Sequence, residues 1–360
     1  MSLSPPSLLI VHPGALGDGL LALPALRVLQ ATFPGHRMIW FGHKELGEVL
    51  VDAQEVHQSY SFDRLELLAY RGPNVSHYEK ILSILGRCER AIGWLEDSEG
   101  IWRNWLRTAG IQNCILRSPH DPTLLHAHMA DRYMEILQPW VQTKQVISDR
   151  ETKVNLARLL VLSKSQSART PCSIKEPLVV LHAGSGSRYK CASPVLWASI
   201  VNGLMMVQPH RNICLVGGPA DTDSLRNVQG LLTHLEYTIL TGIDLLSVGQ
   251  YLQHARLFIG HDSGLSHLAA SLGIPSVLLF GPTDPAKWAP RRTHVAVIRK
   301  SCHCIGKASI AHCTDRPCLS ILPHEVLAKV EEVLCGVKAS ATHGATFGCV
   351  DEALNVPCLG

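Results

Sequence analysis

The chain has 360 residues, of which 46% are hydrophobic and 18% are charged. This composition allows a large buried core and excludes an intrinsically disordered chain, while the length favours two domains. The formal net charge of only +3 provides no general attraction for nucleic acid or for a membrane surface, so any basic site must be local.

The longest apolar stretches, such as Ile274 to Phe280, have the length of a strand rather than of a membrane-spanning helix. The first residues lack the basic start and the long apolar run of a signal peptide. Twelve cysteines in a chain without an export signal favour free thiols in a reducing compartment. We therefore expect a cytoplasmic protein.

Strand-like and helix-like segments alternate through most of the chain, which predicts an α/β fold with parallel sheets covered by helices on both faces. The first expected domain, residues 1–165, is hardest to assign between Asp63 and Asp149. Pro24 is expected to bend or divide the first helix. The expected elements are strands at Leu8 to Val11 and Met38 to Phe41, and helices at Gly19 to Phe33, His77 to Leu85 and Ala130 to Leu137.

The polar, proline-containing stretch from Ser163 to Pro177 has no periodicity, so residues 166–177 are the expected linker. A second domain is expected over residues 178–335, followed by an irregular tail over 336–360. Its expected strands are Leu178 to His182, Ile213 to Val216, Leu257 to Ile259 and Ser276 to Phe280. Its expected helices are Pro194 to Val207, Asp221 to Leu232, Leu245 to His254, Ser263 to Leu272 and Leu322 to Leu334.

Both halves open in the same way, with an apolar strand, a glycine-containing turn and a helix. This repetition predicts two Rossmann-like domains that face a central cleft. In such sheets ligands bind beyond the carboxyl ends of the strands, so the turns after the strands are the places to search for chemistry.

The first turn reads His12-Pro13-Gly14-Ala15-Leu16-Gly17-Asp18-Gly19. Its glycines allow a tight turn and a close approach to a ligand. Asp18 is expected at the start of the helix and facing the cleft, where it has two interpretations: a helix cap or a catalytic carboxylate. The spacing is not the G-x-G-x-x-G of dinucleotide-binding sites, which gives little support to hydride transfer.

The second turn reads Gly260-His261-Asp262-Ser263-Gly264-Leu265-Ser266-His267 and lies between a strand and a helix. This places Asp262, Ser263 and Gly264 at a helix N-terminus, where free N–H groups and the helix dipole favour a diphosphate. His267 follows one turn later on the same side. The alternative is an ordinary cap with a packed histidine.

Two further turns carry polar groups. The stretch from His182 to Lys190 combines small residues with the cations Arg188 and Lys190, which suits a phosphate leaving group but also a solvated loop. The stretch from Gly217 to Asp223 places Asp221 where it would accept hydrogen bonds from ribose hydroxyls. Its Asp-Thr-Asp sequence also resembles a divalent-metal pair, although helix capping explains these aspartates without a metal.

A cysteine cluster lies near the end of the second expected domain. Its four thiols offer the ligand set of a structural zinc site, but the spacing departs from the usual C-x-x-C pattern, so free thiols are favoured. The four cysteines are Cys302, Cys304, Cys313 and Cys318.

Taken together, these motifs resemble glycosyltransferase family 9, which includes the lipopolysaccharide heptosyltransferases. The likeness covers about Leu8 to Leu334 and is strongest from Gly260 to Pro290, which contains D-S-G-L-S-H-L-A-A, G-I-P, F-G-P-T and W-A-P. The matching N-terminal signature is the Gly17-Asp18 pair followed by L-P-A-L-R.

The resemblance implies the GT-B architecture and transfer with inversion at the anomeric carbon, without a cofactor or a metal. It implies that Asp18 is the general base. For the donor it assigns the diphosphate to Lys190, Ser185, Gly186, Asp262, Ser263, Gly264 and His267, and the ribose and base to Asp221 and Ile243. Gly17 and His12 fall on the acceptor side.

The family usually carries Lys or Arg six residues before the catalytic aspartate, where this chain has His12. A cation there suits a phosphate-bearing acceptor, so the acceptor is expected to differ. The partners implied are a nucleotide-sugar donor, with ADP favoured, and a lipopolysaccharide core or other glycan or glycolipid acceptor at the inner face of the cytoplasmic membrane. Two alternatives remain: a sugar-nucleotide epimerase or hydrolase, and a noncatalytic nucleotide-sugar-binding protein.

Overall fold

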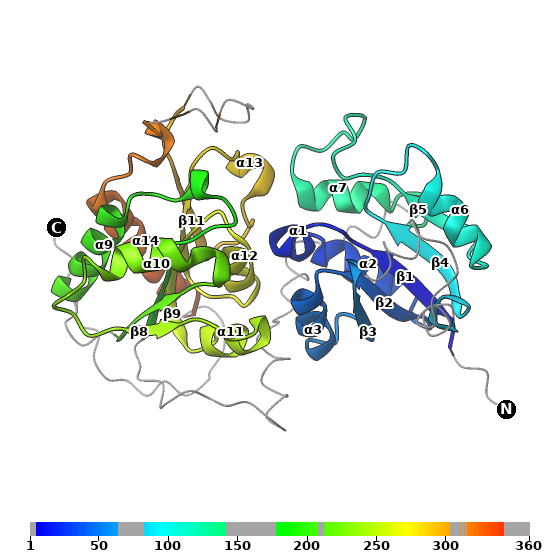
Figure 1. Ribbon diagram of the computed structural model, residues 1–360, viewed down its shortest axis with the longest axis horizontal. Coiled ribbons are helices and arrows are strands. Elements are labelled where there is room, and N and C mark those ends of the chain that lie inside the picture. The colour runs from blue at the N-terminus through cyan, green and yellow to red at the C-terminus, as the bar shows by residue number, and fades with distance from the viewer. Residues whose placement is uncertain are drawn as a thin grey trace.

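The computed structural model describes residues 5–63, 83–141, 178–207, 212–302, 310, 313 and 315–341. The described chain forms two α/β units that lie side by side (Figure 1). The expected linker over residues 166–177 lies outside the described residues, as does most of the helical patch expected from His77.

The N-terminal unit is built on a five-stranded parallel sheet of order β3-β2-β1-β4-β5. Every residue of β1 is buried, as expected for a central parallel strand covered on both faces. The elements are β1 (Ser7–Val11), α1 (Leu16–Leu21), α2 (Leu23–Thr32), β2 (Arg37–Gly42), α3 (Lys44–Asp52), β3 (Gln58–Ser61), β4 (Cys88–Gly93), α6 (Ile101–Thr108), β5 (Asn113–Leu116) and α7 (Met129–Ile136).

The single helix expected from Gly19 to Phe33 is two helices. α1 ends at Leu21 and α2 begins at Leu23, with Pro24 in its first turn. Proline is well tolerated there because its missing N–H would have no intrahelical partner. The division predicted from Pro24 is therefore confirmed, although α1 begins three residues earlier than expected.

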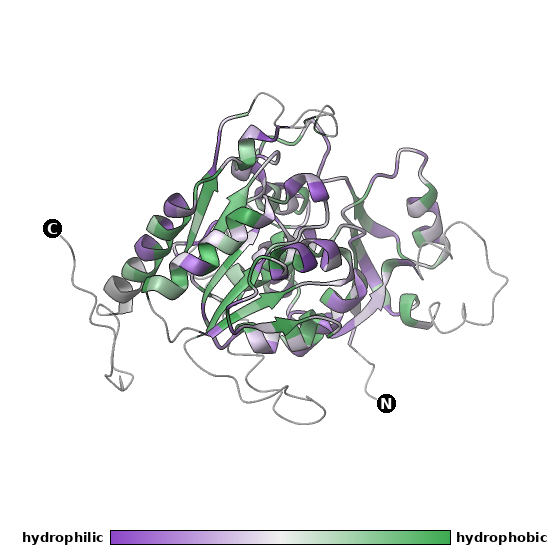
Figure 2. Ribbon diagram, turned by 60° about the vertical axis from the view of Figure 1, so that its left-hand side comes forward, coloured by the Kyte–Doolittle hydropathy of each residue, from purple (hydrophilic) through white to green (hydrophobic). Residues whose placement is uncertain are grey.

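The C-terminal unit contains a six-stranded parallel sheet of order β11-β10-β9-β6-β7-β8. Hydrophobic strands run through the middle of the unit, and helices of mixed hydropathy cover them (Figure 2). The elements are β6 (Leu178–His182), α9 (Pro194–Val207), β7 (Asn212–Val216), α10 (Thr222–Gln229), β8 (Thr238–Leu240), α11 (Leu245–Leu252), β9 (Ala255–His261), α12 (Gly264–Ser271), β10 (Ser276–Phe280), α13 (Pro285–Trp288), β11 (Val295–Arg299) and α14 (Pro323–Ala341).

Several expected bounds agree with the structure, including those of β6, α9 and β10. The last helix differs. α14 continues to Ala341, so the expectation of an irregular chain from Gly336 is wrong for its first residues. A lone glycine weakens a helix by only about 1 kcal/mol, which the apolar face of the preceding turns can offset.

Within the described residues no helix is both long and apolar enough to cross a membrane.

The two units meet through their helices. α1 lies against α12, and α3 lies against α11, so the first helix of the N-terminal sheet faces the helix that follows β9 (Figure 1). Two polar contacts also join the units: Arg291 Nη1 donates to Asp131 Oδ2 at 2.7 Å, and His128 Nε2 lies 2.9 Å from the carbonyl oxygen of Ala289. The carboxyl ends of β1 and β9 are thereby brought to a common boundary.

A buried ion pair fixes α2 in the N-terminal unit. Arg27 Nη2 lies 2.6 Å from Glu55 Oε1, and Arg27 Nε also donates to this carboxylate.

Arg27→Ala should lower the free energy of unfolding by about 3–5 kcal/mol in urea denaturation, because Glu55 would remain buried without its partner. The double variant Arg27→Met with Glu55→Leu should lose much less of the free energy of unfolding, because no buried charge is left unpaired. Equal losses in the two variants would contradict this role of the pair.

Candidate active site

The site lies where α1 and α12 meet. Ser263 caps α12, with its side chain accepting from the backbone N–H of Ser266, as expected for the residue before a helix start. Gly264 follows, and a Cβ at this position would lie 2.6 Å from Leu16 Cδ2 and 2.8 Å from Leu16 Cβ. Only glycine therefore allows α1 to approach so closely. Gly17 faces the ring of His267 across the same contact.

Asp18 is the third residue of α1 and is half-buried. Its Oδ2 accepts from the backbone N–H of Ala15 at 3.1 Å, so the carboxylate does cap its own helix. It also lines a cavity, so capping and a chemical role are compatible. Burial raises the pKa of Asp18 above its usual value, and the nearby His267, His120 and Lys190 offset this only in part. A carboxylate with a raised pKa is a stronger base.

The cavity beside Asp18 has a volume of about 230 Å³. It opens at the carboxyl ends of β1 and β4, where ligands of parallel sheets are expected. Its walls combine aromatic rings, two carboxylates and two histidines. The lining residues are His12, Pro13, Gly14, Asp18, Trp94, Leu95, Glu96, Ser118, Pro119, His120 and Tyr133.

His12, which stands where a cation was expected from the family pattern, is buried and uncharged. Its ring stacks on Trp40 at a centroid distance of 5.2 Å, and its Nε2 lies 3.2 Å from the hydroxyl of Tyr133. Burial lowers the pKa of His12 to about 4. At neutral pH this position therefore contributes no positive charge to the cavity.

On the other side of the domain contact, Asp262 joins three segments. Its Oδ2 accepts from Lys190 Nζ and from Thr283 Oγ1, both at 2.7 Å, and its Oδ1 lies 3.9 Å from His267 Nε2. The hydroxyl of Ser185 donates to its backbone carbonyl at 3.0 Å. These contacts bring together four of the seven residues that the resemblance assigned to a diphosphate, namely Lys190, Ser185, Asp262 and His267.

The pKa of Asp262 is well below its usual value. Burial alone would raise it, but the nearby His267, the charge and hydrogen bond of Lys190, and the hydrogen bond from Thr283 together outweigh burial. The carboxylate is therefore ionised at any physiological pH. It holds Lys190 at the N-terminus of α12, where the cation and the helix dipole act on the same space.

A second buried network supports this helix start from beneath. His182 Nε2 lies 3.1 Å from Asp221 Oδ2, and His182 Nδ1 lies 3.1 Å from Ser263 Oγ. Because an ionised carboxylate only accepts hydrogen bonds, Nε2 carries the proton and Nδ1 can accept from the serine hydroxyl. His182 thus links the end of β6 to the cap of α12.

Asp221 is buried, with an exposed fraction of 7%. Its Oδ2 also accepts from the backbone N–H of Gly218 at 2.8 Å. Burial would raise the pKa of Asp221, but the bonds from His182 and the backbone lower it. A Cβ at Gly184 would lie 1.9 Å from Asp221 Oδ1, so only glycine allows this approach. In this structure Asp221 positions the loop after β6, and its contact with a ribose stays a prediction.

The remaining assigned residues lie on the same edge of the C-terminal sheet. Gly186 is exposed in the loop after β6, and Ile243 is half-buried between β8 and α11. Cys304 lies outside the described residues. Among the residues that are described, no group of three or more His, Cys, Asp or Glu side chains is arranged to hold a metal ion. The zinc alternative, which also needs Cys304, stays a prediction.

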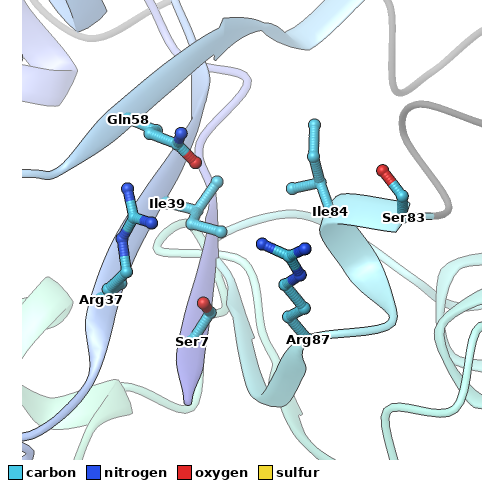
Figure 3. A pocket seen from close by; sticks show the side chains of 7 residues that line it. All are labelled: Ser7, Arg37, Ile39, Gln58, Ser83, Ile84 and Arg87. Atoms are coloured by element: carbon cyan, nitrogen blue, oxygen red, sulfur yellow. The ribbon is translucent and has the colours of Figure 1, made fainter. Parts of the chain in front are cut away.

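Another cavity, of about 120 Å³, lies at the opposite edge of the N-terminal sheet. Ser7, Arg37 and Gln58 begin three neighbouring strands there, and Arg87 points toward the same space (Figure 3). Ligands of doubly wound sheets bind at the carboxyl ends of the strands, and this cavity is at the amino ends. It is therefore separate from the candidate active site.

The sequence did not single out Trp94, Glu96, His120, Tyr133 or Thr283. Trp94 and Glu96 directly follow β4, so assigning that strand would have placed them at the ligand-binding edge. Thr283 belongs to the F-G-P-T motif, but the motif alone does not indicate that Thr283 donates to Asp262. His120 and Tyr133 have no local signal, because only the packing of α7 and its preceding loop brings them to Asp18.

Two facing Rossmann-like units, with a half-buried carboxylate on one side and a lysine at a helix N-terminus on the other, are the arrangement expected for a glycosyltransferase of the GT-B architecture. Residues 102–318 match the family model of glycosyltransferase family 9 (heptosyltransferase). The chain belongs to this family.

Comparison with known proteins agrees with this assignment. The chain is 23% identical over 360 aligned residues to lipopolysaccharide heptosyltransferase 3 of Escherichia coli K12, covering 91% of this chain and 98% of the relative. A family 9 glycosyltransferase from Veillonella parvula has the same fold, with a TM-score of 0.65 at 18% identity over 93% and 99% of the two chains. The E. coli heptosyltransferase WaaC with ADP gives a TM-score of 0.64 at 18% identity over 91% and 99%.

Gly264→Ala tests the contact between the two helices. The added Cβ would overlap Leu16, so α1 and α12 must separate, and we expect a lower melting temperature by calorimetry. Gly336→Ala is the matched control, since a Cβ there meets nothing within 4 Å and alanine favours a helix by up to about 1 kcal/mol. A Gly264→Ala protein as stable as the control would refute the close contact.

Proposed function

We propose that the chain transfers a heptose from ADP-heptose to a sugar of a lipopolysaccharide core, with inversion at the anomeric carbon. The observation that carries this proposal is the position of Asp18. Its carboxylate lines a cavity whose walls include the rings of Trp94 and Tyr133, and the Lys190–Asp262 pair lies on the other side of the contact of α1 with α12. An acceptor and a donor would therefore meet between these two groups.

The donor diphosphate would lie at the start of α12. The N–H groups of the first turn, around Ser263 and Gly264, lack intrahelical partners and favour an anion. Lys190 adds a positive charge that its contact with Asp262 holds in place. Ser185 and Gly186 would contribute from the loop after β6, and His267 from the α12 face that meets Gly17.

Transfer itself needs a base and a stabilised leaving group. Asp18 would take the proton of the acceptor hydroxyl as its oxygen attacks the anomeric carbon. The bond from that carbon to the diphosphate oxygen breaks on the opposite face, and ADP leaves with the bonding electrons. Lys190 and the α12 N-terminus would stabilise the growing negative charge, so we propose a reaction that needs no metal.

The nucleoside would extend along the same edge of the sheet. Asp221 and Ile243 follow the neighbouring strands β7 and β8, at the same edge of the sheet as the start of α12. We assign the ribose to the segment containing Asp221 and the base to that containing Ile243. The E. coli heptosyltransferase WaaC, whose structure was solved with ADP, shares this fold.

We place the reaction in the cytoplasm, at the inner face of the membrane, where a lipid-linked acceptor and a nucleotide sugar would both be accessible. Membership of glycosyltransferase family 9 favours transfer over the alternatives of epimerisation and noncatalytic binding. The alternatives differ in how turnover depends on the acceptor. An epimerase turns over without an acceptor, and a noncatalytic protein shows no turnover with any acceptor.

Asp18→Asn should retain donor binding and lose about 10²–10⁴-fold in transfer rate, because the amide cannot take the hydroxyl proton. In the unchanged protein the rate should fall as the pH decreases through the raised pKa of Asp18, since only the deprotonated form acts. Both are measured as ADP release in the presence of acceptor. Asp223→Asn, at an exposed aspartate paired with Arg226, is the matched control. Full activity of Asp18→Asn would exclude the role.

Calorimetric titration with ADP, UDP and GDP, without added metal, tests the donor site. We expect a preference for ADP. Lys190→Ala should weaken ADP binding by about 10–100-fold, because a hydrogen bond to a charged group contributes roughly 1.5–3 kcal/mol. Lys329→Ala removes a lysine of similar exposure from α14 and should change nothing. If none of the three nucleotides binds, the result argues against the transferase. A preference for UDP or GDP would replace ADP as the proposed donor nucleotide.

A further inference from the structure

The loop between β6 and α9 carries Ser185, Gly186 and Lys190, which the proposed function assigns to the donor diphosphate. Gly184 and Ala192, near its two ends, are buried. Its middle is open to solvent, because Gly186 is exposed and the Lys190 side chain keeps 28% of its surface accessible. Holding a long charged side chain in one place costs conformational entropy, so the use of Lys190 depends on how firmly this loop is held.

The ring of His261 binds both ends of this loop. Its Nε2 accepts from the backbone N–H of Ala192 at 2.8 Å, and its Nδ1 lies 3.1 Å from the carbonyl oxygen of Gly184. His261 is the last residue of β9 and directly precedes Asp262, whose carboxylate accepts from Lys190 Nζ at 2.7 Å. The strand that leads to the partner of Lys190 therefore also fixes both ends of the loop on which Lys190 lies.

The protonation of His261 matches these two partners. A carbonyl needs a donor and a backbone N–H needs an acceptor, and a neutral imidazole protonated on Nδ1 offers one of each. The side chain is fully buried, and burial lowers the pKa of His261 to about 3, so the ring stays neutral at physiological pH. Trp197 of α9 packs against it in a T-shaped contact, with ring centroids 4.9 Å apart. The ring therefore has one tautomer and one orientation.

Arg316 supports the same loop from its outer side. Its Nη1 donates to the carbonyl oxygen of Arg188 at 3.1 Å and to that of Cys191 at 3.4 Å. These bonds hold the turn around Lys190, and they are only partly shielded from water. The two bonds of His261 are fully buried, so they are the ones that fix where the loop leaves and rejoins the sheet.

We propose that His261 is a positioning residue for the donor site: by binding Gly184 and Ala192, it holds the loop after β6 so that Lys190 is in place before the diphosphate binds. His261 is fully buried, so it acts through Lys190 rather than by contact with a substrate. The gain in affinity comes from a lower cost of ordering the loop on binding. The inference rests on the proposed function and adds to it a residue outside the assigned set.

His261→Phe keeps a ring against Trp197 and removes both hydrogen bonds. In calorimetric titration its dissociation constant for ADP should rise about 5–10-fold, because Lys190 keeps its charge but must be ordered on binding. In the Lys190→Ala background the same change should weaken ADP binding less than about twofold, since the lysine that His261 positions is gone. His261→Gln, whose side-chain oxygen can accept from Ala192, should bind ADP within about twofold of the unchanged protein.

A merely structural role would lower the melting temperature and leave the dissociation constant for ADP unchanged. His294→Phe is the matched control, because His294 Nε2 lies 3.0 Å from the carbonyl oxygen of Ala270, near the other end of α12. We expect it to lower the melting temperature without changing ADP affinity. An unchanged dissociation constant in His261→Phe, or equal weakening with and without Lys190, would overturn the proposal.

A second pair of variants covers the case in which His261→Phe does not fold. His261→Asn has a shorter side chain that can reach the carbonyl of Gly184 but not the N–H of Ala192. It should bind ADP more weakly than His261→Gln, because the end of the loop nearer to Lys190 is released. Equal ADP affinity of the two variants would contradict the positioning role.

Hydrogen exchange separates this inference from the proposed function, because it needs no nucleotide. The amide of Ala192 is bonded to a buried ring, so it should exchange at least about tenfold faster in His261→Phe than in the unchanged protein. If the unchanged protein binds no nucleotide, the proposed function fails, and the exchange rate alone decides whether His261 orders the loop. If ADP binds and His261→Phe changes neither exchange nor affinity, the proposed function stands and the inference fails.

Discussion

The buried carboxylate of Asp262 is the interaction on which the rest of the site depends. It lies at the junction of β9 and α12 and accepts from Lys190 and Thr283, which come from the loops after β6 and β10. The carboxyl ends of three adjacent strands are therefore tied to one charge. A buried carboxylate needs such partners, because leaving it unpaired would cost several kcal/mol. The same partners place a cation at the helix start.

The close contact of the two units depends on the steric fit between α1 and α12. The absence of a side chain at Gly264 lets Leu16 reach the backbone of α12, and this contact sets how far Asp18 lies from the cationic side. Arg291 with Asp131, and His128 with the Ala289 carbonyl, hold the units together away from the centre. The chemistry of one domain is thus positioned by the packing of the other.

The strands β1, β2, β6, β7, β9 and β10 and the motif-bearing turns could be predicted from the sequence, because continuous apolar runs and glycine-containing turns are local signals. The strands β3, β4, β5, β8 and β11 were not predicted. β6, α9 and β10 were obtained with their bounds on this basis. The partners within the site could not. Asp221 was assigned by family likeness to a ribose, yet its bond to His182 depends on the closeness of the end of β6 to the turn after β7. The cavity around Asp18 likewise depends on α7, whose Tyr133 is 115 positions away.

The two sides of the site have opposite electrostatic character, and this difference matches the chemistry. On the side proposed for the donor, Lys190 and an N-terminal dipole lie beside an aspartate whose pKa is lowered, so negative charge is stabilised there. On the side proposed for the acceptor, burial raises the pKa of Asp18, and no Lys or Arg is among the described residues that line the cavity. In the proposed transfer, a proton would be accepted where the field is least positive, and the leaving group would depart where it is most positive. Charge moves in this direction when a hydroxyl displaces a nucleoside diphosphate, so the separation itself favours transfer over simple binding.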